Sequence, residues 1–115
     1  MTLNGITYNL KPEYPSGNSQ RERGYYIDSL KQPNAPYWYI ICSGERSTGG
    51  YSINITNIEI DENQNCKVTV RESSPAPGEV VTQDLTYPAC VLELSKVPTS
   101  ITIQNEQGEL FNHIP

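Results

Sequence analysis

The apolar residues of this chain occur in short runs of β-branched side chains, and this pattern constrains the fold more than any other feature. Ile (11), Val (6) and Thr (9) far outnumber Ala (3), Leu (7) and Met (1). β-branched side chains favour pleated sheets, whereas Ala, Leu and Met favour helices. The 8 Gly and 9 Pro residues separate the runs, as turns separate short strands. The sequence therefore predicts an all-β chain.

The predicted strands follow one another after Gly24. We expect them at residues 24–28, 37–42, 51–60, 66–72, 79–85, 87–94 and 101–104. The continuous apolar run at 37–42 is typical of a central strand that is covered on both faces. Within 51–60 the apolar positions change parity between Ile55 and Ile58, which predicts a β-bulge near Thr56 or Asn57.

Short strands at this spacing predict a single antiparallel β-sandwich or a partly open barrel. We assign residues 24–115 to this domain and residues 1–23 to a polar, partly mobile N-terminal segment. At most one short helix is expected, in the N-terminal part, within residues 19–30. A chain of 115 residues is long enough to bury a small core without disulfides.

Charge and side-chain inventory exclude several classes of function. The formal net charge of −5 opposes binding to nucleic acid and to anionic membranes. No apolar run reaches the roughly 18 residues of a membrane helix. The single histidine, His113, lies near the end of the chain, where a catalytic role is not expected. We therefore expect no enzyme, no nucleic-acid partner and no membrane insertion.

Metal, cofactor and disulfide chemistry also lack support in the sequence. The three cysteines, Cys42, Cys66 and Cys90, form no CxxC pair, so no zinc site or disulfide framework is expected. One disulfide with one free thiol is the alternative for an exported protein. Cys42 and Cys90 lie in apolar runs and are expected to be small buried hydrophobes. Five carboxylates fall on predicted strands, namely Glu59, Glu72, Glu79, Asp84 and Glu93. No spacing pairs any two of them for glycoside hydrolysis, so solvated strand faces are expected.

Two loops are the strongest candidates for a binding surface. The first, GERSTGGY at residues 44–51, contains adjacent glycines that permit positive φ and close backbone approach. The second, SSPAPG at residues 73–78, contains two prolines and therefore loses little entropy on binding. A plain turn is the alternative for each loop. The predicted partner-binding residues are Arg46, Thr48, Gly49, Gly50, Tyr51, Pro75, Pro77 and Gly78.

Two blocks that contain these loops resemble the C-terminal domain of the protease complex subunit PrcB. ICSGERSTGGYSINI (41–55) is similar to a strand, TGGY loop and strand of that family. VTVRESSPAPGEVVTQDLTYP (68–88) is similar to its V-x-V, Pro-Gly turn and TYP segment. The matching positions are Gly44, Thr48, Gly49, Gly50, Tyr51, Pro75, Gly78, Tyr87 and Pro88. The resemblance implies a non-catalytic accessory module of an extracytoplasmic bacterial protease complex.

The first functional interpretation is thus a protein-interaction module that binds or stabilises a protease. It requires both loops to lie at the same end of the sheets. It also implies an extracytoplasmic location, although no signal peptide is visible. The second interpretation is a protease inhibitor that inserts the Thr48–Tyr51 loop into a protease cleft through backbone contacts, with Gly49 and Gly50 permitting close approach. A few residues of this loop also resemble a loop of chagasin-type inhibitors. The third is a carbohydrate- or cell-wall-binding module that uses Trp38 and the tyrosines as an exposed, coplanar strip.

Overall fold

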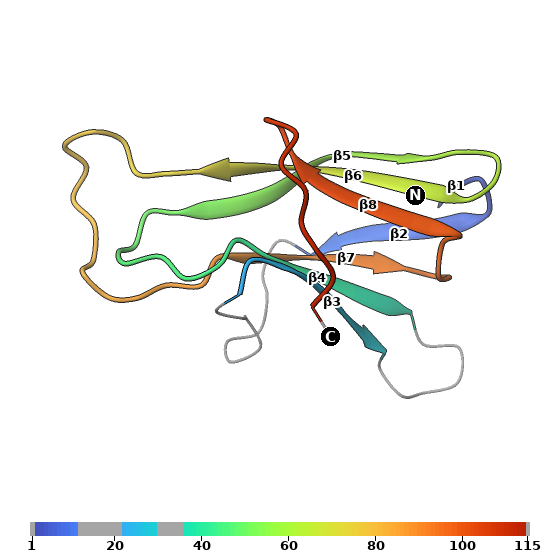
Figure 1. Ribbon diagram of the computed structural model, residues 1–115, viewed down its shortest axis with the longest axis horizontal. Coiled ribbons are helices and arrows are strands. Elements are labelled where there is room, and N and C mark those ends of the chain that lie inside the picture. Colours follow the sequence, from blue (N-terminus) through green and yellow to red (C-terminus); the bar gives the residue numbers. More distant parts are fainter. Residues whose placement is uncertain (1, 12–21, 30–35, 115) are drawn as a thin grey trace.

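The computed structural model describes residues 2–11, 22–29 and 36–114, which form eight β-strands and no helix. The strands are β1 (Thr2–Leu3), β2 (Ile6–Lys11), β3 (Gly24–Ser29), β4 (Tyr37–Cys42), β5 (Ser52–Ile60), β6 (Asn65–Ser73), β7 (Ala89–Leu94) and β8 (Ser100–Asn105). They build two sheets, in the orders β1-β2-β7-β4-β3 and β5-β6-β8, which stack as two layers (Figure 1). The predicted all-β sandwich is confirmed, and the sheets do not close into a barrel.

The described residues of the N-terminal part form strands. β2 pairs with β7 from Tyr8 to Lys11, so it belongs to the larger sheet. Where a short helix was considered, residues 24–29 form β3, and residues 19–21 and 30 lie outside the described residues. Within the described part of the chain there is accordingly no helix long and apolar enough to span a membrane.

Strand pairing is antiparallel except between β6 and β8, which are parallel. β4 lies between β3 and β7, in the middle of the larger sheet. Its side chains alternate, so Tyr39 and Ile41 face the smaller sheet while Ile40 and Cys42 face the opposite side. All four are buried. This confirms the prediction of a central strand covered on both faces.

The main core lies between the two sheets. Its buried residues are Ile6, Tyr39, Ile41, Ile53, Ile60, Cys66, Val68, Val70, Cys90, Leu92, Leu94, Ile103 and Phe111. Phe111 reaches the core from the segment that follows β8, and Ile6 reaches it from β2. The three cysteines are buried and form no disulfide, so Cys42 and Cys90 are small buried hydrophobes as predicted.

Two local irregularities follow the sequence pattern. The β5–β6 register shifts between Ile55 and Asn57, which confirms the predicted bulge. The β5–β6 turn is closed by Asp61, whose carboxylate accepts hydrogen bonds from the backbone N–H groups of Asn63 and Asn65, each at 2.9 Å. These bonds, first among them the one from the Asn65 backbone, lower the pKa of Asp61.

The strand prediction was wrong at residues 79–85. This stretch forms no strand and belongs to an irregular connection from β6 to β7. Val80 and Leu85, whose apolar side chains suggested a strand, are 97% and 54% exposed. β7 begins at Ala89 rather than at Tyr87. Pro88 lies between them and has no N–H to donate to a neighbouring strand.

Two connections between the sheets extend beyond the strands at the same end of the molecule (Figure 1). They are residues 43–51, between β4 and β5, and residues 74–88, between β6 and β7. Backbone N–H groups of Arg46 and Thr86 each donate to the other residue's carbonyl, at 2.8 and 2.9 Å. We refer to these two connections as the paired-loop end. The condition that both loops lie at one end of the sheets is therefore met.

Candidate functional site

A carboxylate lies at the base of the paired-loop end. On β6 the buried residues Val68 and Val70 face the core, and the period of two along a strand places Glu72 on the same face. The side chain of Glu72 is only 14% exposed. The prediction of a solvated strand face was therefore wrong for Glu72. The parity of β6 is the sequence signal that could have found it.

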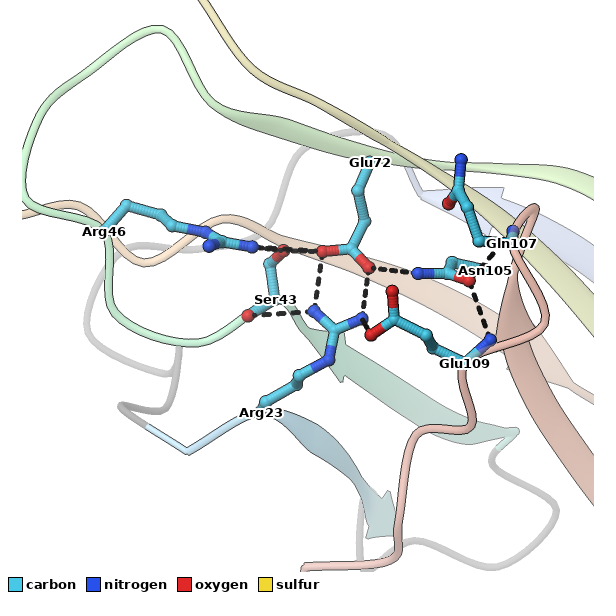
Figure 2. A network of polar contacts seen from close by, with 7 residues as sticks. All are labelled: Arg23, Ser43, Arg46, Glu72, Asn105, Gln107 and Glu109. Atoms are coloured by element: carbon cyan, nitrogen blue, oxygen red, sulfur yellow. Dashed lines mark hydrogen bonds and ion pairs between the residues drawn. The ribbon is translucent and has the colours of Figure 1, made fainter.

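Four side chains from other elements bind this carboxylate (Figure 2). Arg23 donates to both oxygens of Glu72, at 2.7 and 2.5 Å. The Ser43 hydroxyl donates at 2.6 Å, and the Asn105 amide and Arg46 Nη2 donate at 3.2 Å each. The network connects β6 and β8 of the smaller sheet to the start of β3 and the end of β4 in the larger one. It thus ties the two sheets together below the loops.

The network keeps the carboxylate ionised. Burial alone would raise the pKa of Glu72, but hydrogen bonds from Arg23, Ser43 and Asn105 outweigh burial and lower the pKa to about 2. The hydrogen bond with Glu72 also raises the pKa of Arg23. A carboxylate with so low a pKa is a poor general base, so it does not activate the Ser43 hydroxyl as a nucleophile at neutral pH.

A polar pocket of about 420 Å³ opens over this network. It is lined by Arg23, Ser43, Arg46, Glu72, Asn105, Gln107 and Glu109. The guanidinium of Arg23 lies 4.2 Å from the ring centroid of Phe111, a cation–π arrangement. Both arginines that line the pocket already pair with Glu72. The described residues gather no group of three or more His, Cys, Asp or Glu side chains that could hold a metal ion.

The two adjacent glycines predicted for partner binding lie where the two loops meet. The N–H of Gly49 donates to the carbonyl of Thr82 at 2.9 Å, and a Cβ on Gly49 would lie 2.5 Å from the Thr82 hydroxyl. Gly50 has φ of +86°, and its Cβ would lie 2.8 Å from Val81 and 2.9 Å from Pro75. Both glycines, and Pro75 with them, therefore allow the loops to pack closely.

Three further predicted residues make contacts within the paired-loop end. The Arg46 guanidinium lies 5.1 Å from the ring centroid of Tyr51, and the carbonyl of Thr48 accepts a hydrogen bond from the Thr86 hydroxyl at 2.8 Å. All three predicted residues are half-buried. They consequently belong to the base that holds the loops in place.

The remaining predicted residues, Pro77 and Gly78, lie at an exposed tip. The backbone N–H of Glu79 donates to the carbonyl of Ala76 at 3.0 Å, and the Glu79 carboxylate accepts from the N–H of Ala76 at 2.8 Å. These two bonds close a turn whose next residue, Val80, is 97% exposed. Sequence reasoning missed Val80 as a surface residue because it assigned this valine to a strand. We refer to residues 76–80 as the Val80 tip.

The aromatic residues do not share one surface. Tyr26 and Trp38 lie on the outer face of the larger sheet, whereas Tyr25 and Tyr39 pack on the core side. Tyr39 is 1% exposed, and the indole N–H of Trp38 donates to the Glu93 carboxylate at 2.9 Å. A flat surface for sugar stacking needs several rings on one face, and these four rings are divided between two faces.

Comparison with known proteins gives one family match. The model of the family described as PrcB C-terminal matches residues 38–95. The matched stretch begins in β4 and ends just after β7, so it contains both connections of the paired-loop end. No curated protein and no solved structure matches the chain.

Proposed function

The chain belongs to the PrcB C-terminal family, and on this premise we propose that it is a non-catalytic interaction module in a protease complex. In this role it binds and stabilises an extracytoplasmic protease through the paired-loop end. The observation that carries the proposal is the Val80 tip. It presents an almost fully exposed aliphatic side chain on a loop that hydrogen bonds and close packing hold in place.

The chemistry of the tip supports binding to a protein. Pro77, Gly78 and Val80 are exposed together on one turn, and Leu85 on the same connection is 54% exposed. Solvent-exposed aliphatic side chains gain free energy when a partner covers them. The turn is already closed by the bonds between Ala76 and Glu79, so little conformational entropy is lost when it binds.

The inhibitor interpretation has less support at the loop for which it was made. An inhibitor that inserts residues 48–51 into a cleft needs the backbone of Gly49 and Gly50 to approach the protease. In this fold the space beside both glycines is filled by Thr82, Val81 and Pro75. The Val80 tip is the more accessible part of the paired-loop end.

Affinity capture with a charged variant tests the proposal. Val80→Asp places a carboxylate on the tip, and Val97→Asp is the matched control, since Val97 is 55% exposed in the β7–β8 connection at the opposite end of the sheets (Figure 1). Both variants should keep the free energy of unfolding within about 0.5 kcal/mol of the wild type. The proteins are used as bait on envelope and secreted fractions of the source cell, with mass spectrometry of what they retain.

We expect a protease to be retained by the wild type and by Val97→Asp, and to be lost by Val80→Asp. A retained protease that is active supports an accessory subunit, and one that is blocked supports an inhibitor. Equal retention by both variants contradicts binding through the Val80 tip. Retention of no protease by any of the three proteins contradicts the proposed function itself.

A further inference from the structure

The outer edge of β3 pairs with the C-terminal segment of the same chain. The N–H of Tyr25 donates to the carbonyl of Asn112 at 2.9 Å, and the N–H of Ile114 donates to the carbonyl of Tyr25 at 2.7 Å. These bonds form an isolated parallel bridge between Tyr25 and His113. In Figure 1 the segment crosses from β8 to this edge. The edge therefore already accepts extended backbone.

Two more positions on the same edge have no backbone hydrogen-bond partner among residues 2–11, 22–29 and 36–114. Alternate residues of a strand direct their backbone N–H and C=O groups to the same side, so those of Ile27 and Ser29 point outward like those of Tyr25. No described residue hydrogen-bonds to these outward groups. The side chain of Ile27 is also 40% exposed. β3 contains neither Lys nor Pro, and Asp28 is its one charged residue; charged residues and Pro commonly protect an edge strand.

Gly24 leaves space on this edge for the aliphatic side chain of the paired segment. Its φ is +153°, and a Cβ would lie 2.5 Å from the carbonyl oxygen of Asn112 and 2.8 Å from Cγ1 of Ile114. The aliphatic side chain of the paired segment thus lies directly against the backbone of Gly24. The segment approaches this closely only because residue 24 has no side chain.

We propose that the outer edge of β3 is a strand-addition site for an extended segment of a protein partner, and that residues 112–114 compete for it within the chain. The partner segment replaces the tail at Tyr25, continues along Ile27 and Ser29, and places an aliphatic side chain against Gly24. Backbone hydrogen bonds supply its affinity, and the space over Gly24 supplies its side-chain preference.

The existing bridge at Tyr25 indicates that the partner is an extended segment, because such a segment continues the same backbone pairing along β3. The tail uses one of the three outward positions of the edge, whereas a longer extended segment uses all three. A partner therefore forms more backbone hydrogen bonds than it displaces. β3 lies outside the matched residues 38–95, so this inference is independent of the function proposed for the paired-loop end.

A peptide with the sequence of residues 110–115, LFNHIP, tests the site on the full chain. Ile114→Pro removes the N–H that bonds to Tyr25 and so opens the edge, while Ile114→Val keeps this N–H as the matched control. Backbone amide signals of the labelled protein are followed by NMR as peptide is added. We expect saturable shifts at Tyr25 and Ile27, with an affinity on the order of tenfold higher for Ile114→Pro than for Ile114→Val.

A second opened variant covers the case in which Ile114→Pro keeps its tail in place, which a still-protected Tyr25 amide would reveal. This variant ends at Phe111, so it retains the buried ring but lacks the competing segment. Adding Gly24→Val to an opened variant should abolish peptide binding, because the new side chain fills the space of the aliphatic residue.

Two outcomes overturn the proposal. The first is an absence of peptide-induced shifts in both opened variants when their spectra show that they are folded. The second is dimerisation of an opened variant without peptide, measured by sedimentation at rising protein concentration. That result would assign the edge to a second copy of the chain instead of a partner segment.

Discussion

Glu72 and Val80 lie at the same end of the sandwich in opposite environments. Glu72 carries a charge, yet its side chain is 14% exposed and four side chains donate hydrogen bonds to it. Val80 is aliphatic, yet it is 97% exposed. Proteins usually place these residue types the other way round. The partners of Glu72 stabilise its buried charge. For Val80, no comparable contact among the described residues explains why an aliphatic side chain faces the solvent.

The difference separates residues that hold the loops from residues that the loops display. Arg46 and Gly50 belong to the first group, because one binds Glu72 and the other allows the loops to pack. Pro77, Gly78 and Val80 belong to the second. A recognition loop benefits from this division, since a rigid base lowers the entropy cost of binding at the tip. Substitutions in the two groups should therefore differ in their effects on stability and on binding.

Removal of the Glu72 carboxylate should have the largest effect. Glu72→Ala removes the carboxylate that pairs with both Arg23 and Arg46, and leaves Arg23 only the longer 3.9 Å contact with the exposed Glu109 among the described residues. We expect the free energy of unfolding to fall by about 2–3 kcal/mol, less than for a fully buried pair, because the Arg23 side chain is 32% exposed. Urea unfolding followed by Trp38 fluorescence measures this loss.

An exposed ion pair nearby provides the matched control. Arg71 Nε donates to the Glu106 carboxylate at 3.0 Å, and the two side chains are 63% and 38% exposed. Glu106→Ala should therefore change the free energy of unfolding by less than about 0.5 kcal/mol. If the Glu72 and Glu106 variants lose equal stability, the Glu72 network contributes no more than a surface pair and the contrast with the tip fails.

Lowering the pH should weaken the same network by protonating Glu72, without removing any side chain. The pKa of Glu72 is about 2 in the folded chain, below its ordinary value of 4.5. A group with a lowered folded pKa contributes its full stability above its unfolded pKa, and the contribution is lost as the pH falls from there through the folded pKa. Between pH 4.5 and pH 2, the free energy of unfolding should therefore fall by on the order of 2–3 kcal/mol more in the wild type than in Glu72→Gln.

Urea titrations at several pH values across this window measure the difference. Asp61 also has a lowered pKa, but it titrates in both proteins, so the comparison isolates Glu72. Parallel stability curves for the wild type and Glu72→Gln would mean that the network does not stabilise the ionised carboxylate.

The fold was predictable where side-chain alternation was sufficient evidence. The apolar run at 37–42 identified the central strand, and the parity change in 51–60 located the bulge between Ile55 and Asn57. The same local reasoning failed at 79–85, because a strand also needs a neighbouring backbone. Among the described residues, the backbone of the other loop bonds within 79–85 at Thr82 alone, through the N–H of Gly49.

The candidate site was predictable only in its local parts. Glycines and prolines marked both loops, since these residues restrict or extend backbone conformation wherever they occur. The partners of Glu72 could not be predicted in this way. Arg23, Ser43 and Asn105 come from three distant parts of the sequence, and a local pattern carries no information on their convergence. The parity of β6 could have placed Glu72 on the core face, where a solvated face was predicted, but parity does not identify its partners.

Two glycines of the paired-loop end give the smallest and most closely matched comparison. Gly50 and Gly78 have nearly equal φ values of +86° and +82°, so alanine strains the backbone similarly at both. A Cβ at Gly50 also meets Val81 and Pro75, whereas a Cβ at Gly78 meets no atom within 4 Å. We expect the free energy of unfolding to fall by about 2 kcal/mol for Gly50→Ala and about 1 kcal/mol for Gly78→Ala.

Because the backbone strain is common to both variants, the difference between them reports the packing of one loop against the other. Urea unfolding of the two proteins side by side measures it, and equal losses would place Gly50 with the displayed residues rather than with the base. Partner capture provides a second measurement that separates the base from the tip. Gly50→Ala should weaken capture by loosening the base beneath an unchanged tip, and Val80→Asp should abolish capture without loss of stability. If Gly50→Ala destabilises the fold yet binds the partner fully, the tip works without a rigid base, and preorganisation is not the reason for packing the loops together.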